Sequence, residues 1–172
     1  MASLVKININ QEKEFEVSDD LLPLMGKTLN GLVEDHLKES PDTPWLLKSP
    51  DVSPEAFENM IEFAKLLSKI PEEQFLKGTD DKEKKLKIDK PLPSPDIKVW
   101  LKEYPSFFPF LETLQADKEL VFGLLIAGNW AGFTILTDLI GCIIAAHCIG
   151  KRVEELREYF DIESDFTPEE EK

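Results

Sequence analysis

The chain has 172 residues, and its 34 Asp and Glu against 20 Lys and Arg give a formal net charge of −14 at pH 7. This charge argues against nucleic acid or an anionic membrane as a partner, because both would repel it. The length suits one ordinary domain, with or without an extension, and is enough to bury a core without metal or disulfide support. Cys142 and Cys148 provide no disulfide framework, which fits a reducing compartment.

The first 50 residues predict a small sheet and a helix. Apolar and polar side chains alternate over 3–9 and again over 14–17, and the polar residues between them indicate a β-hairpin. Residues 28–38 carry leucine and valine at the spacing of one helix face. A short third strand is expected over 43–47.

A second helix is predicted over 53–67. Ser53 is a suitable N-cap and Pro54 suits the first turn. Its apolar residues recur at helical spacing: Phe57, Met60, Ile61, Ala64 and Leu67.

The character of the chain changes after this helix. Residues 71–98 are rich in charge and proline, which predicts a mobile loop because ordering them would bury too little apolar area. An aromatic stretch follows over 99–114, and its rings either cover the edge of the core or form an exposed patch; we expect core cover. The aromatic residues concerned are Trp100, Phe107, Phe108 and Phe110.

The last third of the chain predicts three helices. Asp117 is the expected cap of an apolar helix over 118–130, and Gly150 is a suitable end for a helix over 133–150. The second of these is apolar on nearly all sides, yet too short and too often interrupted by polar residues to cross a membrane. Another part of the protein or a partner must therefore cover it. A shorter amphipathic helix is expected over 153–160.

No motif in the sequence indicates catalysis. Cys142, His147 and Cys148 invite a zinc or nucleophile interpretation, but their spacing spreads the side chains around the helix axis. Glycine-rich phosphate loops, HExxH and GxSxG are absent from the sequence. We therefore expect no catalytic residues, no metal and no cofactor. An enzyme using His147 or Cys148 is kept as a formal alternative.

The final residues, SDFTPEEEK (164–172), resemble the beginning of a helix. Thr167 is a good N-cap, Pro168 suits the first position and Glu170 is placed for a capping box. Only five residues follow Thr167, too few to hold a helix alone.

The C-terminal third resembles the SKP family, the adaptor subunits of Skp–cullin–F-box ubiquitin ligases. The similarity is loose before residue 124 but extends over nearly the whole chain. The matching residues follow the family's order: Asn129-Trp130, Gly150-Lys151, Glu154-Glu155, Phe160-Asp161-Ile162 and Asp165-Phe166-Thr167.

The resemblance implies an α+β BTB/POZ fold over 1–131, followed by a helical extension over 132–172. The loop at 71–98 and an aromatic insertion at 101–116 would lie within the first part. In the family, the BTB part binds the N-terminal region of a cullin and the late helices hold an F-box protein. The location would then be the cytoplasm and nucleus.

The resemblance also implies site residues. Asn129 and Trp130 match the family's cullin-facing pair, although a helix-terminal Asn and a core Trp would explain them equally well. The late helices offer apolar residues for an F-box, about half of which we expect to touch it. These candidates are Leu136, Leu139, Ile140, Ile143, Val153, Leu156, Phe160, Ile162 and Phe166.

Two departures from the family pattern affect the late helices. Arg152-Val153 stands where the family has a Thr-Pro cap, so the helix after it should fray more at its start. The family's acidic Thr-Glu-Glu start leads into a last helix with a tryptophan, whereas this sequence stops at Lys172. The chain is therefore either a shortened form or a divergent paralogue, and F-box binding should be weaker.

A different class of function remains open. The same apolar helices, without an F-box, would allow a structural or assembly role through self-association, including a homodimer.

Overall fold

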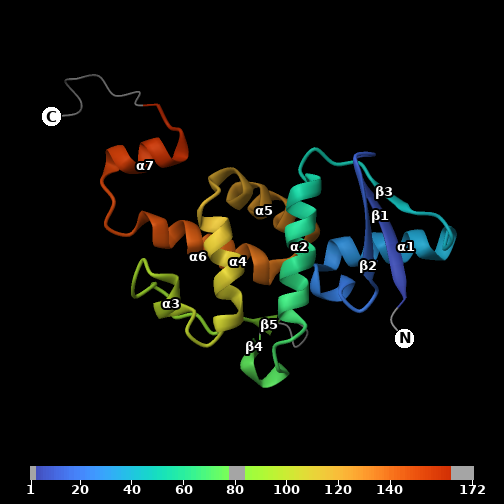
Figure 1. The fold of residues 1–172 in the computed structure, drawn as a ribbon, viewed down its shortest axis with the longest axis horizontal. Helices are drawn as coiled ribbons and strands as arrows, with labels where there is room; N and C mark the ends of the chain where they lie inside the picture. The colour runs from blue at the N-terminus through green and yellow to red at the C-terminus, as the bar shows by residue number, and fades with distance from the viewer. Residues whose placement is uncertain (1–2, 78–83, 164–172) are drawn as a thin grey trace.

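The computed structural model describes residues 3–77 and 84–163 and places a three-stranded sheet at one end of the molecule (Figure 1). Strands β1 (Leu4–Ile9) and β2 (Lys13–Ser18) are antiparallel, and β3 (Trp45–Leu47) pairs parallel to β1 on its other side. The predicted hairpin and third strand are thus confirmed. Asn10 adopts a φ of 53° in the turn, a conformation that asparagine tolerates well, so the hairpin needs no glycine.

Helices make up most of the remaining structure. The α-helices are α1 (Lys27–Glu39), α2 (Pro54–Leu67), α3 (Ile97–Trp100), α4 (Phe108–Gln115), α5 (Lys118–Ala131), α6 (Thr134–Cys148) and α7 (Val153–Phe160). Short 3₁₀ turns lie at Leu22–Leu24, Glu72–Gln74 and Pro105–Phe107, and a two-stranded ribbon joins β4 (Leu76–Lys77) to β5 (Lys84–Lys85). In the described parts of the chain, no helix has the length and apolar character needed to cross a bilayer.

Helix ends follow the predicted caps. The Ser53 hydroxyl accepts a hydrogen bond from the backbone N–H of Ala56 at 3.1 Å, and an Asp117 carboxylate oxygen accepts one from Leu120 at 3.0 Å. Each cap satisfies an N–H group that the helix itself leaves without a partner. The predicted helices that begin at these two caps are therefore confirmed.

Helix α5 lies at the centre of the core and packs against α1, α2, α4 and α6. The Phe63 ring of α2 contacts three further aromatic rings there, with centroid distances of 5.3 to 5.7 Å. These partners are Phe107, Phe110 and Phe133.

The aromatic stretch covers the core, as predicted. Trp100 and Phe107 are buried, while Phe108 and Phe110 are half-buried against the same cluster. The stretch also contains Tyr104, which is fully buried.

The segment predicted as a loop over 71–98 has buried anchors in its described flanks. Leu86 and Ile97 belong to the core. The Tyr104 hydroxyl donates a hydrogen bond to the Gln74 carbonyl at 2.7 Å and accepts one from the Lys87 N–H at 2.9 Å. A single buried side chain thereby holds both sides of the segment. Residues 78–83 of the predicted loop lie outside the described residues.

Candidate protein-binding site

The predicted cullin-facing pair lies in the last turn of α5. This helix ends at Gly132, which has a φ of 71° and donates a backbone hydrogen bond to the Asn129 carbonyl at 3.2 Å. A Cβ atom at Gly132 would lie 3.2 Å from the Thr28 hydroxyl, so the end of α5 packs tightly against the start of α1. The position of this turn is therefore set by the core of the first part of the chain.

Asn129 is exposed in this turn, and Trp130 is half-buried with its ring against the core. The structure brings a third side chain to the same surface, because Ile126 precedes Asn129 by three residues and is 51% exposed. A large ring supported by the core, an exposed amide and an exposed aliphatic side chain form a small, mixed surface of the kind found at protein interfaces.

The predicted F-box residues on α6 are enclosed by the chain itself. All four side chains are buried in the core, with Ile143 the least covered at 3% exposed. They therefore position α6 rather than offer surface to a partner in this conformation. The four are Leu136, Leu139, Ile140 and Ile143.

The predicted F-box residues on and after α7 have surface available. Val153 is 59% exposed and Ile162 is 58% exposed, whereas Leu156 and Phe160 are half-buried. Helix α7 contains no buried residue, although it is amphipathic. Phe166 lies outside the described residues, as does the helix start predicted at Thr167.

Helix α7 lies at the edge of the molecule, beyond the end of α6 (Figure 1). The Tyr159 ring stacks on the imidazole of His147 with a centroid distance of 3.9 Å. Phe122 of α5 contacts both Tyr159 and Phe160, at 6.0 and 6.1 Å between centroids. The Lys118 ammonium lies 2.5 Å from an Asp161 carboxylate oxygen. These contacts join α7 to the start of α5 and the end of α6.

The first turn of α7 has half of a capping box. The Arg152 backbone N–H donates to the Glu155 carboxylate at 3.0 Å. This bond and the Lys151 ammonium lower the pKa of the Glu155 carboxyl, against a small effect of burial. An arginine side chain has no acceptor atom, so it cannot satisfy the N–H groups of the turn as serine or threonine would.

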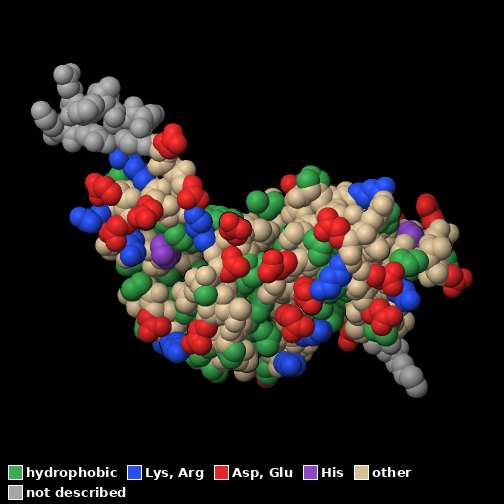
Figure 2. All heavy atoms as spheres, turned by 45° about the horizontal axis from the view of Figure 1, so that its top comes forward, with side chains coloured by type: hydrophobic (Ala, Val, Ile, Leu, Met, Phe, Trp, Pro, Cys, Tyr) green, Lys and Arg blue, Asp and Glu red, His purple; other side chains and the backbone are tan. Residues whose placement is uncertain are grey.

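Charged side chains are spread over the visible face of the molecule, with both signs gathered around α7 (Figure 2). No group of three or more His, Cys, Asp or Glu is arranged to hold a metal ion within the ranges that the structure describes. Cys142 is buried, and burial raises the pKa of its thiol. His147 is exposed and stacked on Tyr159. Cys148 is half-buried, so the three residues considered for a zinc or nucleophile site lie in different surroundings.

Comparison with known proteins identifies the class to which this fold and these surfaces belong. The family model described as "Skp1 family, dimerisation domain" matches residues 135–172. The SCF ubiquitin ligase complex protein SKP1a of Dictyostelium discoideum is 29% identical over 170 residues, covering 99% of this chain and 90% of the relative. The E3 ubiquitin ligase complex SCF subunit sconC of Arthroderma otae is 30% identical over 141 residues, covering 81% and 74% respectively.

The chain therefore belongs to the Skp1 family. Over a shorter part of the chain, the sconC subunit of Neosartorya fischeri is 44% identical over 59 residues, which is 34% of this chain and 37% of that protein.

Sequence reasoning missed two contributors to these surfaces. Ile126 lies within a run of apolar residues that carries no period, so only its distance of three residues from Asn129 could have indicated its side. Tyr159 could not be recognised because it attaches α7 through its stack on His147, which lies twelve residues earlier on another helix. The contact between Tyr159 and His147 leaves no local signal in the sequence.

Proposed function

We propose that the chain is a non-catalytic adaptor that links a cullin scaffold to F-box substrate receptors in an SCF-type ubiquitin ligase. Relatives that match most of its length are named as SCF ubiquitin ligase subunits. The single observation that carries the proposal is the α7 stripe, defined as Val153, Leu156 and Phe160 with the adjoining Ile162. An amphipathic helix with none of its residues buried is suited to a partner helix that covers its apolar side.

We further propose that residues 1–131 form a BTB/POZ domain and residues 132–172 a helical extension. The loop at 71–98 and the insertion at 101–116 belong to the first. The three-stranded sheet layered with helices supports this proposal, as does the sharp corner at Gly132 between α5 and α6.

The F-box site contains fewer contact residues in this proposal than in the prediction from the sequence. The buried α6 residues support the site from within, and the α7 stripe makes the contact. The cullin contact is assigned to Asn129 and Trp130, with Ile126 added from the structure. The two surfaces lie on different helices, so one adaptor can hold both partners at once.

The F-box assignment is tested with a purified F-box domain and isothermal titration calorimetry. We expect Val153→Asp with Leu156→Asp to weaken binding by about ten-fold or more, since each carboxylate would be desolvated beside apolar side chains. Val99→Asp is the matched control, because Val99 is 45% exposed on α3, away from α7. Binding at full strength by the double variant would remove the α7 stripe from the proposal.

The cullin assignment is tested with a cullin N-terminal fragment. Trp130→Lys and Ile126→Glu should each reduce binding by about ten-fold or more, because they place charge in the centre of the contact. Leu32→Glu is the control, since Leu32 is 43% exposed on α1. Retained F-box binding shows that the variants are folded. Absence of cullin binding by the unmodified chain would end the proposal.

Self-association is the second candidate, and the description of the matched family model as a dimerisation domain favours it. The α7 stripe would then pack against a second copy of the chain. Light scattering over a range of concentrations separates the two functions. A species that stays monomeric at high concentration rules out the homodimer.

We also propose that the protein acts in the cytoplasm and nucleus. Its two free cysteines are suited to a reducing environment. Imaging of the tagged full-length chain in cells tests this location.

A further inference from the structure

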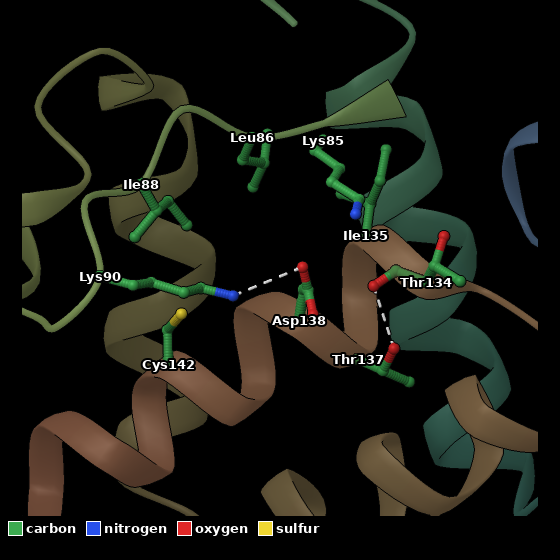
Figure 3. A pocket seen from close by; sticks show the side chains of 9 residues that line it. All are labelled: Lys85, Leu86, Ile88, Lys90, Thr134, Ile135, Thr137, Asp138 and Cys142. Carbon is green, nitrogen blue, oxygen red and sulfur yellow. Dashed lines mark hydrogen bonds and ion pairs between the residues drawn. The ribbon is translucent and has the colours of Figure 1, made fainter. Parts of the chain in front are cut away.

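An open groove runs along α6 on the side that faces residues 85–92 (Figure 3). We call it the α6 groove; Gly141, Ala145 and Ile149 form its floor, and Ile88, Lys90 and Leu92 form its wall. It consists of two adjoining cavities of about 150 and 460 Å³, which share Lys90, Thr137, Asp138 and Cys142. This volume is enough for two or three side chains of a bound segment.

The floor of the groove is apolar and accessible. Ile149 is 40% exposed and Ala145 is exposed. A Cβ atom added at Gly141 would meet no other atom within 4 Å, so the groove is open above this residue. Burial raises the pKa of the adjacent Cys142 thiol, so a neutral side chain completes the apolar lining.

The groove is separate from the α7 stripe. Helix α7 contacts the body through Phe122, Lys118 and His147, and none of these residues lines the groove. In Figure 1, α7 and α3 lie on opposite sides of α6, and residues 85–92 lead into α3. A partner in the groove would therefore leave the α7 stripe free.

The charge of the groove differs in sign from that of the molecule. Lys85 and Lys90 line it against one carboxylate, that of Asp138, whereas the whole chain has a net charge of −14. Lys90 reaches across from the wall to within 3.6 Å of Asp138, and both side chains are more than half exposed. Such an exposed pair is weak, so an incoming carboxylate can compete for the Lys90 ammonium.

We propose that the α6 groove docks a short segment of a third protein, in which aliphatic or aromatic anchor residues are flanked by glutamate or aspartate. The anchors would cover Ala145 and Ile149, and the acidic flanks would meet Lys85 and Lys90. An open groove suits an extended segment better than an enclosed small molecule. The adaptor would thereby hold a further acidic partner beside the two that its proposed function requires.

The charge preference is tested with three fluorescein-labelled ten-residue peptides. All carry the same central leucine and phenylalanine, flanked by glutamates, by serines or by lysines. Fluorescence anisotropy should give the tightest binding for the glutamate peptide, with a preference over the serine peptide that falls as salt rises. Non-specific association with a chain of charge −14 would favour the lysine peptide, so that order, or no binding at all, would overturn the proposal.

Variants locate the binding to the groove. Ala145→Trp, which fills the floor, should weaken binding of the glutamate peptide by about ten-fold or more. Leu32→Trp places the same ring on α1, where Leu32 is exposed and does not line the groove, so this matched control should leave binding unchanged. Lys90→Ala should remove most of the preference for glutamate over serine and keep the binding of the serine peptide.

Ile149→Ser provides an independent test if Ala145→Trp lowers the melting temperature. All of these variants should still bind the F-box domain and the cullin fragment, which separates this inference from the proposed function. Unchanged peptide binding by both Ala145→Trp and Ile149→Ser contradicts the proposal. A loss of self-association in Ala145→Trp would also contradict it, because the occupant would then be a second copy of the chain.

Discussion

At the scale of single residues, Gly26 allows the start of α1 to approach the corner between α5 and α6. It has a φ of 121°, and a Cβ atom there would clash with the Ala131 carbonyl oxygen and lie 2.8 Å from the Phe133 nitrogen. Gly150 also has a positive φ, of 74°, but faces open space. A side chain at Gly150 would therefore cause backbone strain alone, whereas one at Gly26 would cause both strain and a clash with neighbouring backbone atoms.

We expect Gly26→Ala to lower the free energy of unfolding by about 3 kcal/mol or more, because strain and a clash with backbone act together. Gly150→Ala should cost only about 1–2 kcal/mol, from strain alone. Urea denaturation of both variants measures the difference. Equal losses would show that the close approach at Gly26 is not tight.

Tyr104 also stabilises the fold, because its buried hydroxyl forms hydrogen bonds with the backbone of both Gln74 and Lys87. Tyr104→Phe would leave a carbonyl and an N–H group without their partner and should lower the unfolding free energy by about 1–3 kcal/mol. The chain's other tyrosine, Tyr159, is half-buried on α7. Tyr159→Phe should therefore lower the unfolding free energy by less than Tyr104→Phe does.

The pH dependence of stability reports on the same hydroxyl. Burial raises the pKa of Tyr104 above its ordinary value of 10.0, partly offset by the Lys87 hydrogen bond. The folded state therefore holds its proton more tightly than the unfolded state, and stability is lost as pH rises above about 10. Chemical denaturation between pH 8 and 11 should show a smaller loss for Tyr104→Phe than for the unmodified chain. Parallel pH curves would contradict this explanation.

At the scale of elements, α7 has little local support in its first turn. Its first turn lacks a side-chain acceptor at Arg152, and its capping depends on the Glu155 carboxylate. Because the folded state lowers the pKa of Glu155, this support is complete above the carboxyl's ordinary value of 4.5 and is lost as pH falls through the lowered pKa.

We expect Arg152→Ser to stabilise α7 by about 0.5–2 kcal/mol, because the serine hydroxyl would complete the capping box. Glu155→Gln is the opposite test and should increase fraying of the first turn. Hydrogen exchange of the α7 amides measures both. Faster exchange in Arg152→Ser than in the unmodified chain would show that the arginine contributes a contact of its own.

At the scale of the whole molecule, α7 is a peripheral helix attached to a well-packed core. Helix α2 contributes seven buried residues to the core and α7 contributes none. The contacts that hold α7 include two ring contacts with Phe122, one stack on His147, the Lys118 ammonium over the Tyr159 ring and one exposed ion pair. Local opening of α7 should therefore cost much less than global unfolding.

Hydrogen exchange with mass spectrometry tests this division. Amides of α7 should exchange much faster than those of α2 and α5 in the free protein. A bound F-box domain should slow exchange in α7, whereas a bound cullin fragment should not. Strong protection of α7 in the free protein would show that the core extends over it.

The sequence by itself determined the β1–β2 hairpin and the longer helices, but it did not predict the short elements over 72–77 and 84–115. Ser53 and Asp117 cap the helices that they were expected to cap, and alternating apolar residues predicted the β1–β2 hairpin. These signals are local, because caps and periodicity depend on residues within one or two turns. Family membership also followed from the sequence, through residues near Asn129 and after Gly150.

Only the tertiary structure decided which apolar residues remain available to partners. Helix α6 is apolar on nearly all sides, so no period distinguishes Leu136, which is buried, from Ile149, which is exposed. That choice depends on the packing of α6 against α5 and on residues 85–92, which are distant in the sequence. The role of Tyr104 depends on such distant neighbours too, because its hydrogen-bond partners lie 17 and 30 residues away.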